Sequence, residues 1–193
     1  MSNYELSLIL SIEQRLAFPA LSLVRSIAFE TGGTFSPSIK NKNSGATGLI
    51  QFLESTAEKL EKGLYKRLPS MSIAEQLVYV EKYFLQWQKV FKEKPKEAFD
   101  VYALMLHPPL YNKPDSTVFG SSGSKIYEGN KGFDTDKSGV ITKGEIKKKW
   151  EAATGKLLNS SKIPITTVKT NSFIAMSIAI FLCAMYYVLK MPR

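Results

Sequence analysis

The sequence predicts a mainly α-helical fold: a helical domain, a calcium-binding loop of the EF-hand type with one following helix, and a transmembrane helix near the C-terminus. Three observations predict it. Apolar residues recur at helical spacing in several segments between residues 19 and 107. Residues 134–145 carry oxygen-bearing side chains at alternating positions, and residues 172–189 carry no charge. A chain of 193 residues, 44% of them hydrophobic, suffices for one compact domain with appendages.

The first predicted helix covers residues 19–30 and carries the most informative carboxylate of the chain. Leu23 and Ile27 recur on one face, and Glu30 continues the same apolar stripe. Gly32-Gly33 then ends the helix. A carboxyl group among apolar neighbours resists ionisation, so we expect the pKa of Glu30 to rise into the range useful to a general acid. The other interpretation is an ordinary glutamate that points into solvent at a frayed helix end.

Three more helices are predicted before residue 108, over residues 49–62, from Ser72 to before Pro95, and over residues 96–107. Ser72 and Glu75 form a capping-box pattern at the start of the second of these. An apolar stripe along this helix predicts a side that faces the core. The only histidine is His107, which excludes a site built on two histidines. The apolar stripe of the helix that begins at Ser72 consists of Leu77, Val80, Phe84, Trp87 and Phe91.

Residues 110–132 are rich in Pro, Gly, Ser, Asn and Lys and predict an ordered loop with short turns. Residues 134–145 then match the twelve-residue EF-hand pattern, with Gly139 at the sharp turn. The segment 126–133 that leads into the loop contains two glycines and predicts no good helix, whereas residues 142–153 predict an outgoing helix. The expected ligands are the side chains of Asp134, Asp136, Ser138 and Glu145, the carbonyl of Val140, and Thr142 directly or through water.

This half-hand predicts a modest structural Ca²⁺ site and not a tight buffer, because Lys137 lies inside the loop with its three carboxylates. The other interpretation is a polar turn that binds no metal.

A second motif follows Glu30. Residues 45–57 are Gly-Ala-Thr-Gly-Leu-Ile-Gln-Phe-Leu-Glu-Ser-Thr-Ala, and Phe35-Ser36-Pro37 lies between Glu30 and this run. The three blocks, in this order and spacing, resemble the lysozyme-like lytic transglycosylase and goose-type lysozyme superfamily, whose signature is G-x-x-G-L-x-Q-x-x-x-x-T-A. The resemblance covers residues 25–57 and places Glu30 in the position of that family's catalytic acid. It implies a lysozyme-like helical domain.

The resemblance further implies cleavage of the β-1,4 bond between N-acetylmuramic acid and N-acetylglucosamine in peptidoglycan. Glu30 is then the proton donor, Gln51 hydrogen-bonds the substrate, and Gly45 with Gly48 keeps the groove floor low for the sugar rings. The Ala-Tyr-Asn-Ala-Gly block of many lytic transglycosylases is absent. Residues 101–105 occupy the comparable helix, so Tyr102 is the candidate for its substrate-contacting tyrosine.

The reaction outcome stays open between transfer and hydrolysis. Hydrolysis usually requires a second carboxylate, for which Glu54, Glu58 and Asp100 are candidates with no basis for a choice. The transglycosylase route needs only Glu30, first as acid and then as base. For that reason the sequence favours a lytic transglycosylase.

The tail predicts a membrane anchor. The uncharged residues 172–189 would span roughly 27 Å as a helix, close to the hydrocarbon thickness of a bilayer. Tyr186, Tyr187 and Lys190 are typical interfacial anchors. The other interpretation is a buried C-terminal helix. The single cysteine, Cys183, excludes an intramolecular disulfide.

The predicted organisation is therefore a lysozyme-like domain over residues 1–128, the calcium loop with its outgoing helix over 129–153, a linker over 154–171 and a transmembrane helix over 172–190. The N-terminus lacks the basic region of a cleavable secretory signal. Some phage wall-degrading proteins also resemble this chain in placing a similar calcium loop after a lysozyme-like core. These features favour the virion membrane of a membrane-containing phage, where the protein serves wall penetration or lysis, with the host cell envelope as the alternative location.

The net charge of +9 predicts either an anionic partner or simply a basic surface. The expected partners are peptidoglycan glycan strands and a lipid membrane. No nucleic-acid partner is expected, because the chain contains no recognisable binding module. The rival interpretation is a membrane-anchored, calcium-stabilised structural or binding protein of the virion that is catalytically inactive, since a fold alone does not establish activity.

Overall fold

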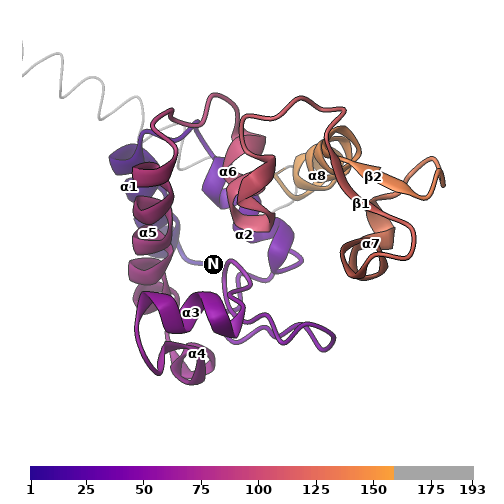
Figure 1. Cartoon of the computed structure of the whole chain (residues 1–193). Coiled ribbons are helices and arrows are strands. Elements are labelled where there is room, and N and C mark those ends of the chain that lie inside the picture. Colours follow the sequence, from indigo (N-terminus) through magenta and orange to yellow (C-terminus); the bar gives the residue numbers. More distant parts are fainter. Residues whose placement is uncertain (159–193) are drawn as a thin grey trace, which may run out of the picture.

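Helices make up most of residues 1–158, which are the part of the chain that the computed structural model describes (Figure 1). Within this part the fold is mainly α, with one antiparallel pair of short strands. The elements are α1 Asn3–Leu16, α2 Ser22–Glu30, α3 Glu54–Leu60, α4 Leu64–Arg67, α5 Ile73–Val90, α6 Ala98–Leu106, β1 Val118–Ser121, α7 Lys125–Asn130, β2 Val140–Thr142 and α8 Lys143–Leu158, with short 3₁₀ helices at 68–70, 108–110 and 131–133.

No helix among residues 1–158 has both the length and the apolar composition needed to cross a bilayer. The predicted transmembrane helix at 172–190 lies outside the described residues, as does the predicted linker beyond residue 158.

Helix α2 confirms the predicted apolar stripe, since Leu23 and Ile27 are fully buried. Its first turn is held by α1, which was not among the predicted helices. Leu21 precedes α2 in a left-handed conformation and supplies no side-chain cap. Instead, the buried carboxylate of Glu13 accepts backbone hydrogen bonds from Leu21, Leu23 and Val24 at 2.8, 2.7 and 3.1 Å. Because these donors would otherwise be unpaired, Glu13 fixes the start of the helix that carries Glu30.

Helices α5 and α6 are confirmed as predicted. Ser72 and Glu75 form the capping box at the start of α5, and Leu77, Val80 and Phe84 are buried in the main core. In Figure 1, α5 runs beside α1, and α6 lies next to α2. The C-terminal end of α2 contacts the middle of α6, where Phe29 meets Tyr102.

The predicted helix over residues 49–62 is wrong at its start, because the helix begins at Glu54 and ends at Leu60. Gly48 and Gln51 both have positive φ angles, which a right-handed helix does not allow. The chain instead turns back on itself, and Thr47 forms bridges with Lys40 and with Phe52. Residues 41–53 are thus a folded loop in front of α3.

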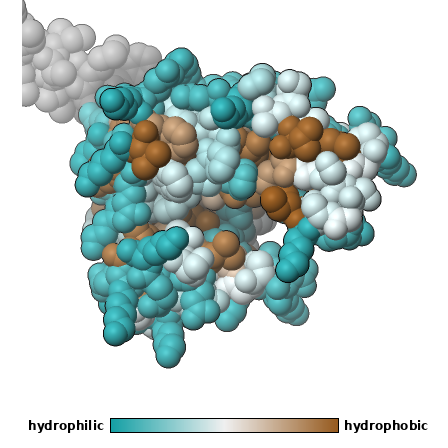
Figure 2. All heavy atoms as spheres, viewed as in Figure 1, coloured by the Kyte–Doolittle hydropathy of each residue, from teal (hydrophilic) through white to brown (hydrophobic). Residues whose placement is uncertain are grey.

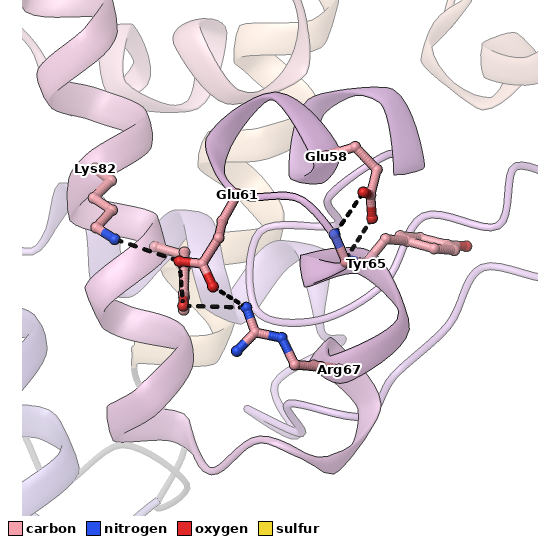
Figure 3. A network of polar contacts seen from close by, with 7 residues as sticks. Glu58, Glu61, Tyr65, Arg67 and Lys82 are labelled. Atoms are coloured by element: carbon pink, nitrogen blue, oxygen red, sulfur yellow. Dashed lines mark hydrogen bonds and ion pairs between the residues drawn. The ribbon is translucent and has the colours of Figure 1, made fainter.

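A polar network holds α3, α4 and α5 together, as Figure 3 shows. Glu58 accepts hydrogen bonds from the backbone of Gly63 and Tyr65 at 2.7 and 3.2 Å. Glu61 pairs with Arg67 and accepts a bond from Tyr79 at 2.9 Å. The network fixes Tyr65, whose hydroxyl donates to the carbonyl of Gly45 at 2.5 Å. The loop 41–53 is consequently anchored to α4 through Tyr65.

A second hydrophobic cluster joins α6, the two strands and α8. Within it, Trp150 of α8 packs against Phe99 and Tyr102 of α6, and Arg25 of α2 lies over the Trp150 ring at 4.2 Å. The predicted loop 110–132 contains β1 and α7, and α8 extends past its predicted end at residue 153. Residues 118–158 therefore pack against α2 and α6 in one continuous body.

Candidate active site

A cavity of about 570 Å³ lies where α2, α6, the loop 41–53 and α7 meet. In Figure 2 the mostly hydrophilic face is hollowed between the part that contains α3 and the part that contains α7. The cavity brings three of the predicted site residues together, namely Glu30, Gln51 and Tyr102. These residues lie far apart in the sequence, so the fold creates the cluster.

Glu30 is the last residue of α2 and is only partly exposed. Burial raises the pKa of its carboxyl group to about 7, against the opposing effect of a hydrogen bond from Tyr102. Tyr102 is 1% exposed. Burial and the neighbouring Glu30 also raise the pKa of the Tyr102 hydroxyl well above its ordinary value, so this hydroxyl stays protonated and donates. A carboxyl group with a pKa near 7 can both give and take a proton at neutral pH.

Aromatic rings pack against Tyr102 and against Phe29, which precedes Glu30 in the sequence. Phe29 meets Tyr102 edge-on with ring centroids 5.2 Å apart, and Trp150 stacks on Tyr102 at 5.7 Å. Phe133, which follows α7, stacks on Phe29 at 6.4 Å. Apolar rings offer no hydrogen bonds to a carboxylate, so burial among them acts in the direction that raises the pKa of Glu30.

Gln51 lies in the turn before α3 and lines the cavity. Its Nε2 donates to the carbonyl of Gly48 at 3.0 Å and to that of Ile39 at 3.4 Å. Among the described residues, none donates to its Oε1, so this oxygen can accept a hydrogen bond from a sugar hydroxyl or amide. The left-handed backbone of Gln51 is strained for a residue with a side chain, a feature that clusters at functional sites.

Gly48 lies beside the buried side chain of Gln76. Neither Gly48 nor Gly45 is among the residues that line the cavity. A side chain at Gly48 would lie 2.4 Å from Oε1 of Gln76. The buried Gln76 accepts from Leu49 at 3.0 Å and donates to carbonyls of Pro37 and Leu68 at 2.6 and 2.7 Å. Gly48 therefore makes room for the buried Gln76 side chain, which anchors the loop, and its role in the floor of a sugar groove stays a prediction.

No candidate for a second catalytic carboxylate lines the cavity, where Glu30 is the only acidic residue among those that the structure describes. Glu58 is engaged by the backbone of Gly63 and Tyr65. Asp100 is buried and accepts from the backbone of Lys96 and Glu97 at the start of α6. Glu54 is exposed at the start of α3. The geometry thus offers one carboxylate and not the pair that hydrolysis usually requires.

The predicted calcium ligands also converge. Carboxylate oxygens of Asp134, Asp136 and Glu145 lie within 4.8 Å of one another. Ser138 donates its hydroxyl to the carbonyl of Val140 at 3.1 Å, and its backbone donates to Asp134 and Asp136. Thr142 binds Glu145 through both its backbone and its hydroxyl at 2.9 Å. The donor set is all oxygen, which suits a hard cation, but the same contacts also stabilise the loop without one.

Several cavity residues carry no motif in the sequence. Asn41, Asn43, Lys125 and Phe133 line the cavity together with the predicted residues. The two asparagines lie in the loop before the signature run, and the other two residues lie in or beside the segment expected to be a loop. The only sequence signal near them is the adjacency of Phe133 to Asp134. Comparisons with protein-family models, curated proteins and solved structures find no match to this chain.

Proposed function

We propose that the protein degrades peptidoglycan by cleaving the β-1,4 bond between N-acetylmuramic acid and N-acetylglucosamine, as a lytic transglycosylase with a lysozyme-like domain over residues 1–128. The observation that carries the proposal is a carboxyl group with a pKa of about 7, Glu30, in one cavity with Gln51 and Tyr102. The single carboxylate of the cavity favours transfer over hydrolysis.

In the proposed reaction, Glu30 protonates the glycosidic oxygen as the bond to the muramyl C1 breaks and the ring gains oxocarbenium character. The N-acetylglucosamine end leaves as an alcohol. Glu30, now a carboxylate, removes the proton from the muramyl 6-hydroxyl, whose oxygen bonds to C1 and forms the 1,6-anhydro product. Glu30 gives up one proton and takes up one, so its carboxyl group is protonated again at the end of the reaction. Tyr102 stabilises the carboxylate stage through its hydrogen bond, and Gln51 orients the sugar.

The test uses the full-length chain on purified peptidoglycan, with Glu30→Gln as the variant and Glu54→Gln as the matched control. We expect Glu30→Gln to lower the rate about 10²- to 10⁴-fold, the usual contribution of a general acid, and Glu54→Gln to keep it. Mass spectrometry of the released muropeptides identifies the outcome: 1,6-anhydro ends support transfer, and reducing ends support hydrolysis.

The rival function is a catalytically inactive, membrane-anchored structural or binding protein of the virion. Equal lysis by the wild type and Glu30→Gln, or lysis by neither, would favour this rival. The proposal further places an anchor at residues 172–190 in the membrane of a membrane-containing phage, or else in the host cell envelope. The apolar sequence of that segment and its aromatic and basic end support the anchor.

The proposal includes a structural Ca²⁺ held by side chains of Asp134, Asp136, Ser138 and Glu145, the carbonyl of Val140 and Thr142. A bound Ca²⁺ would supply positive charge that offsets the mutual repulsion of the carboxylates. The ion then joins β2 and the start of α8 to the segment that follows α7.

We expect millimolar Ca²⁺ to raise the Tm of the wild type in thermal unfolding, because a ligand of the folded state stabilises it. Mg²⁺ should raise the Tm less, since it prefers smaller octahedral sites. Asp136→Ala should lose the Ca²⁺ effect while keeping the fold. A wild-type Tm that is unchanged by Ca²⁺ and by its chelation would contradict the metal site.

A further inference from the structure

Lys125 is the first residue of α7, and its side chain lines the same cavity as Glu30. It is the only cationic residue among the described residues that line this cavity. The structure records no ion pair, hydrogen bond or aromatic contact for its ammonium group among residues 1–158. Elsewhere on the segment, by contrast, Lys131 is paired with Glu128 at 2.6 Å. Lys125 is thus an exposed positive charge, without a recorded partner among the described residues, that lines the cavity of Glu30.

The positive charge of Lys125 does not set the pKa of the Glu30 carboxyl group. Only burial and Tyr102 shift the pKa of the Glu30 carboxyl group, and no ion pair or hydrogen bond joins Lys125 to Glu30, although both residues line the cavity. The loop 41–53 lines the same cavity with Asn41, Asn43 and Ser44, which are polar but neutral. Among the described residues, the lining of the cavity therefore combines one cation from α7 with amide and hydroxyl groups from the loop 41–53.

Hydrogen bonds and a ring contact fix the backbone around Lys125. The hydroxyl of Ser124 caps α7 by accepting from the backbone of Tyr127 at 3.1 Å. The hydroxyl of Tyr127 donates to Asp134 at 2.7 Å, and Phe133 stacks on Phe29 beside the acid. Although the lysine side chain is exposed, its Cα is fixed relative to Glu30. A fixed cation can select among ligands, because the cost of ordering the backbone has been met during folding.

We propose that Lys125 recognises a carboxylate carried by the muramyl residue of the glycan strand, and so distinguishes muramyl-containing strands from neutral N-acetylglucosamine polymers. This inference rests on the proposed function. N-acetylglucosamine carries no charge, whereas each N-acetylmuramic acid carries a lactyl group that ends either in a free carboxylate or in a peptide with its own carboxylates. An ammonium group binds such a carboxylate by a charge-assisted hydrogen bond.

The experiment measures binding by the full-length chain with Glu30→Gln, which prevents turnover. Three soluble glycans serve as probes: strands with intact peptides, strands stripped of peptides by an amidase so that the lactyl carboxylate is free, and chitooligosaccharides. The variants added are Lys125→Met, Lys125→Arg and Lys42→Met. Lys42 is an exposed cation in the loop beside Asn41 that does not line the cavity, so it controls for general charge attraction.

We expect Lys125→Met to weaken binding of a carboxylate-bearing strand about tenfold, equivalent to about 1.4 kcal/mol, and to leave chitooligosaccharide binding unchanged. Lys125→Arg should restore most of the affinity, and Lys42→Met should have little effect. A loss confined to peptide-bearing strands assigns the peptide carboxylates, and a loss on stripped strands assigns the lactyl group. The difference in affinity between the Lys125→Met chain and its parent for a carboxylate-bearing strand should shrink at high salt.

Equal affinities of the Lys125→Met and parent chains for all three glycans would overturn the inference while leaving the proposed function intact. An equal loss for Lys42→Met and Lys125→Met would also overturn it, since general attraction would then account for the effect. If the Glu30→Gln chain bound none of the glycans and the wild type released no muropeptides, the proposed function itself would fail.

Discussion

Tyr102 affects the proton affinity of Glu30 in a direction that can be tested. Its hydrogen bond favours the carboxylate and so lowers the pKa of Glu30, while burial raises that pKa to about 7. Tyr102→Phe removes the bond and leaves the burial, so the pKa of Glu30 should rise further. Since the acid form of Glu30 is lost as pH rises through its pKa, the alkaline limb of activity should move to higher pH.

The measurement is kcat/KM on peptidoglycan as a function of pH, which reports the pKa of the free enzyme. The wild type should lose activity as the pH rises through about 7. Tyr83→Phe is a suitable control, because Tyr83 also lines the cavity but donates to the carbonyl of Leu104. An alkaline limb that stays in place, or moves to lower pH, in Tyr102→Phe would contradict the assigned hydrogen bond.

At the level of residues, the sequence predicted the apolar stripe beside Glu30 better than the other residues around the cavity. Glu30 could be identified because it continues an apolar stripe, and that stripe is buried as predicted. The role of Gly48 in the groove floor stays a prediction, because the glycine of a motif can serve either a ligand or a buried neighbour, and here Gln76 fills the space beside it. Lys125 and Asn43 could not be found, since only the tertiary fold brings them to the cavity.

At the level of elements, the folded loop in front of α3 depends on a glycine. Gly48→Ala would place a methyl group 2.4 Å from Oε1 of Gln76 and would have to adopt a φ of +87°. We expect the free energy of unfolding to fall by about 2–4 kcal/mol, from the left-handed conformation and the disturbed buried hydrogen bonds of Gln76.

Gly32→Ala is the matched control. Gly32 also has a positive φ, but nothing lies within 4 Å of an added methyl group, so only the conformational cost of about 1–2 kcal/mol remains. Urea unfolding of both variants gives the comparison. A loss in Gly48→Ala no larger than that in Gly32→Ala would show that Gln76 does not depend on the space beside Gly48.

The helices with a clear apolar period were predicted well, and the elements that depend on distant contacts were not. The capping box at Ser72 marks the start of α5 correctly. In contrast, residues 49–53 have a helical composition but are held in a turn by bridges to Thr47 and by Gln76. The strand β1 escaped prediction because its burial depends on pairing with β2 and on packing in the cluster that contains Trp150.

At the level of the whole molecule, Trp150 joins the last described helix to the site. It is fully buried, stacks on Tyr102 and lies under Arg25. We expect Trp150→Ala to lower the free energy of unfolding by about 3–5 kcal/mol, as for other large-to-small core changes. The amide protons of α2 and α6 should lose protection along with those of α8, because these helices share one core.

Hydrogen exchange followed by mass spectrometry measures both effects. Trp87→Ala provides a comparison, since Trp87 is half-buried on α5 and packs against Tyr83 and Phe91 on the other cluster. Loss of protection in Trp150→Ala that is confined to α8, with α2 and α6 unchanged, would show that the two clusters unfold independently.

One wall of the cavity comes from residues 125–133, which are made long after the acid at residue 30. A ribosome that has just released α6 from its exit tunnel has therefore produced Glu30, Gln51 and Tyr102 without a finished pocket around them. Translation must continue through Trp150 before the ring that stacks on Tyr102 exists. Chain order thus delays assembly of the pocket until most of the polypeptide is synthesised, and a prematurely terminated product lacks it.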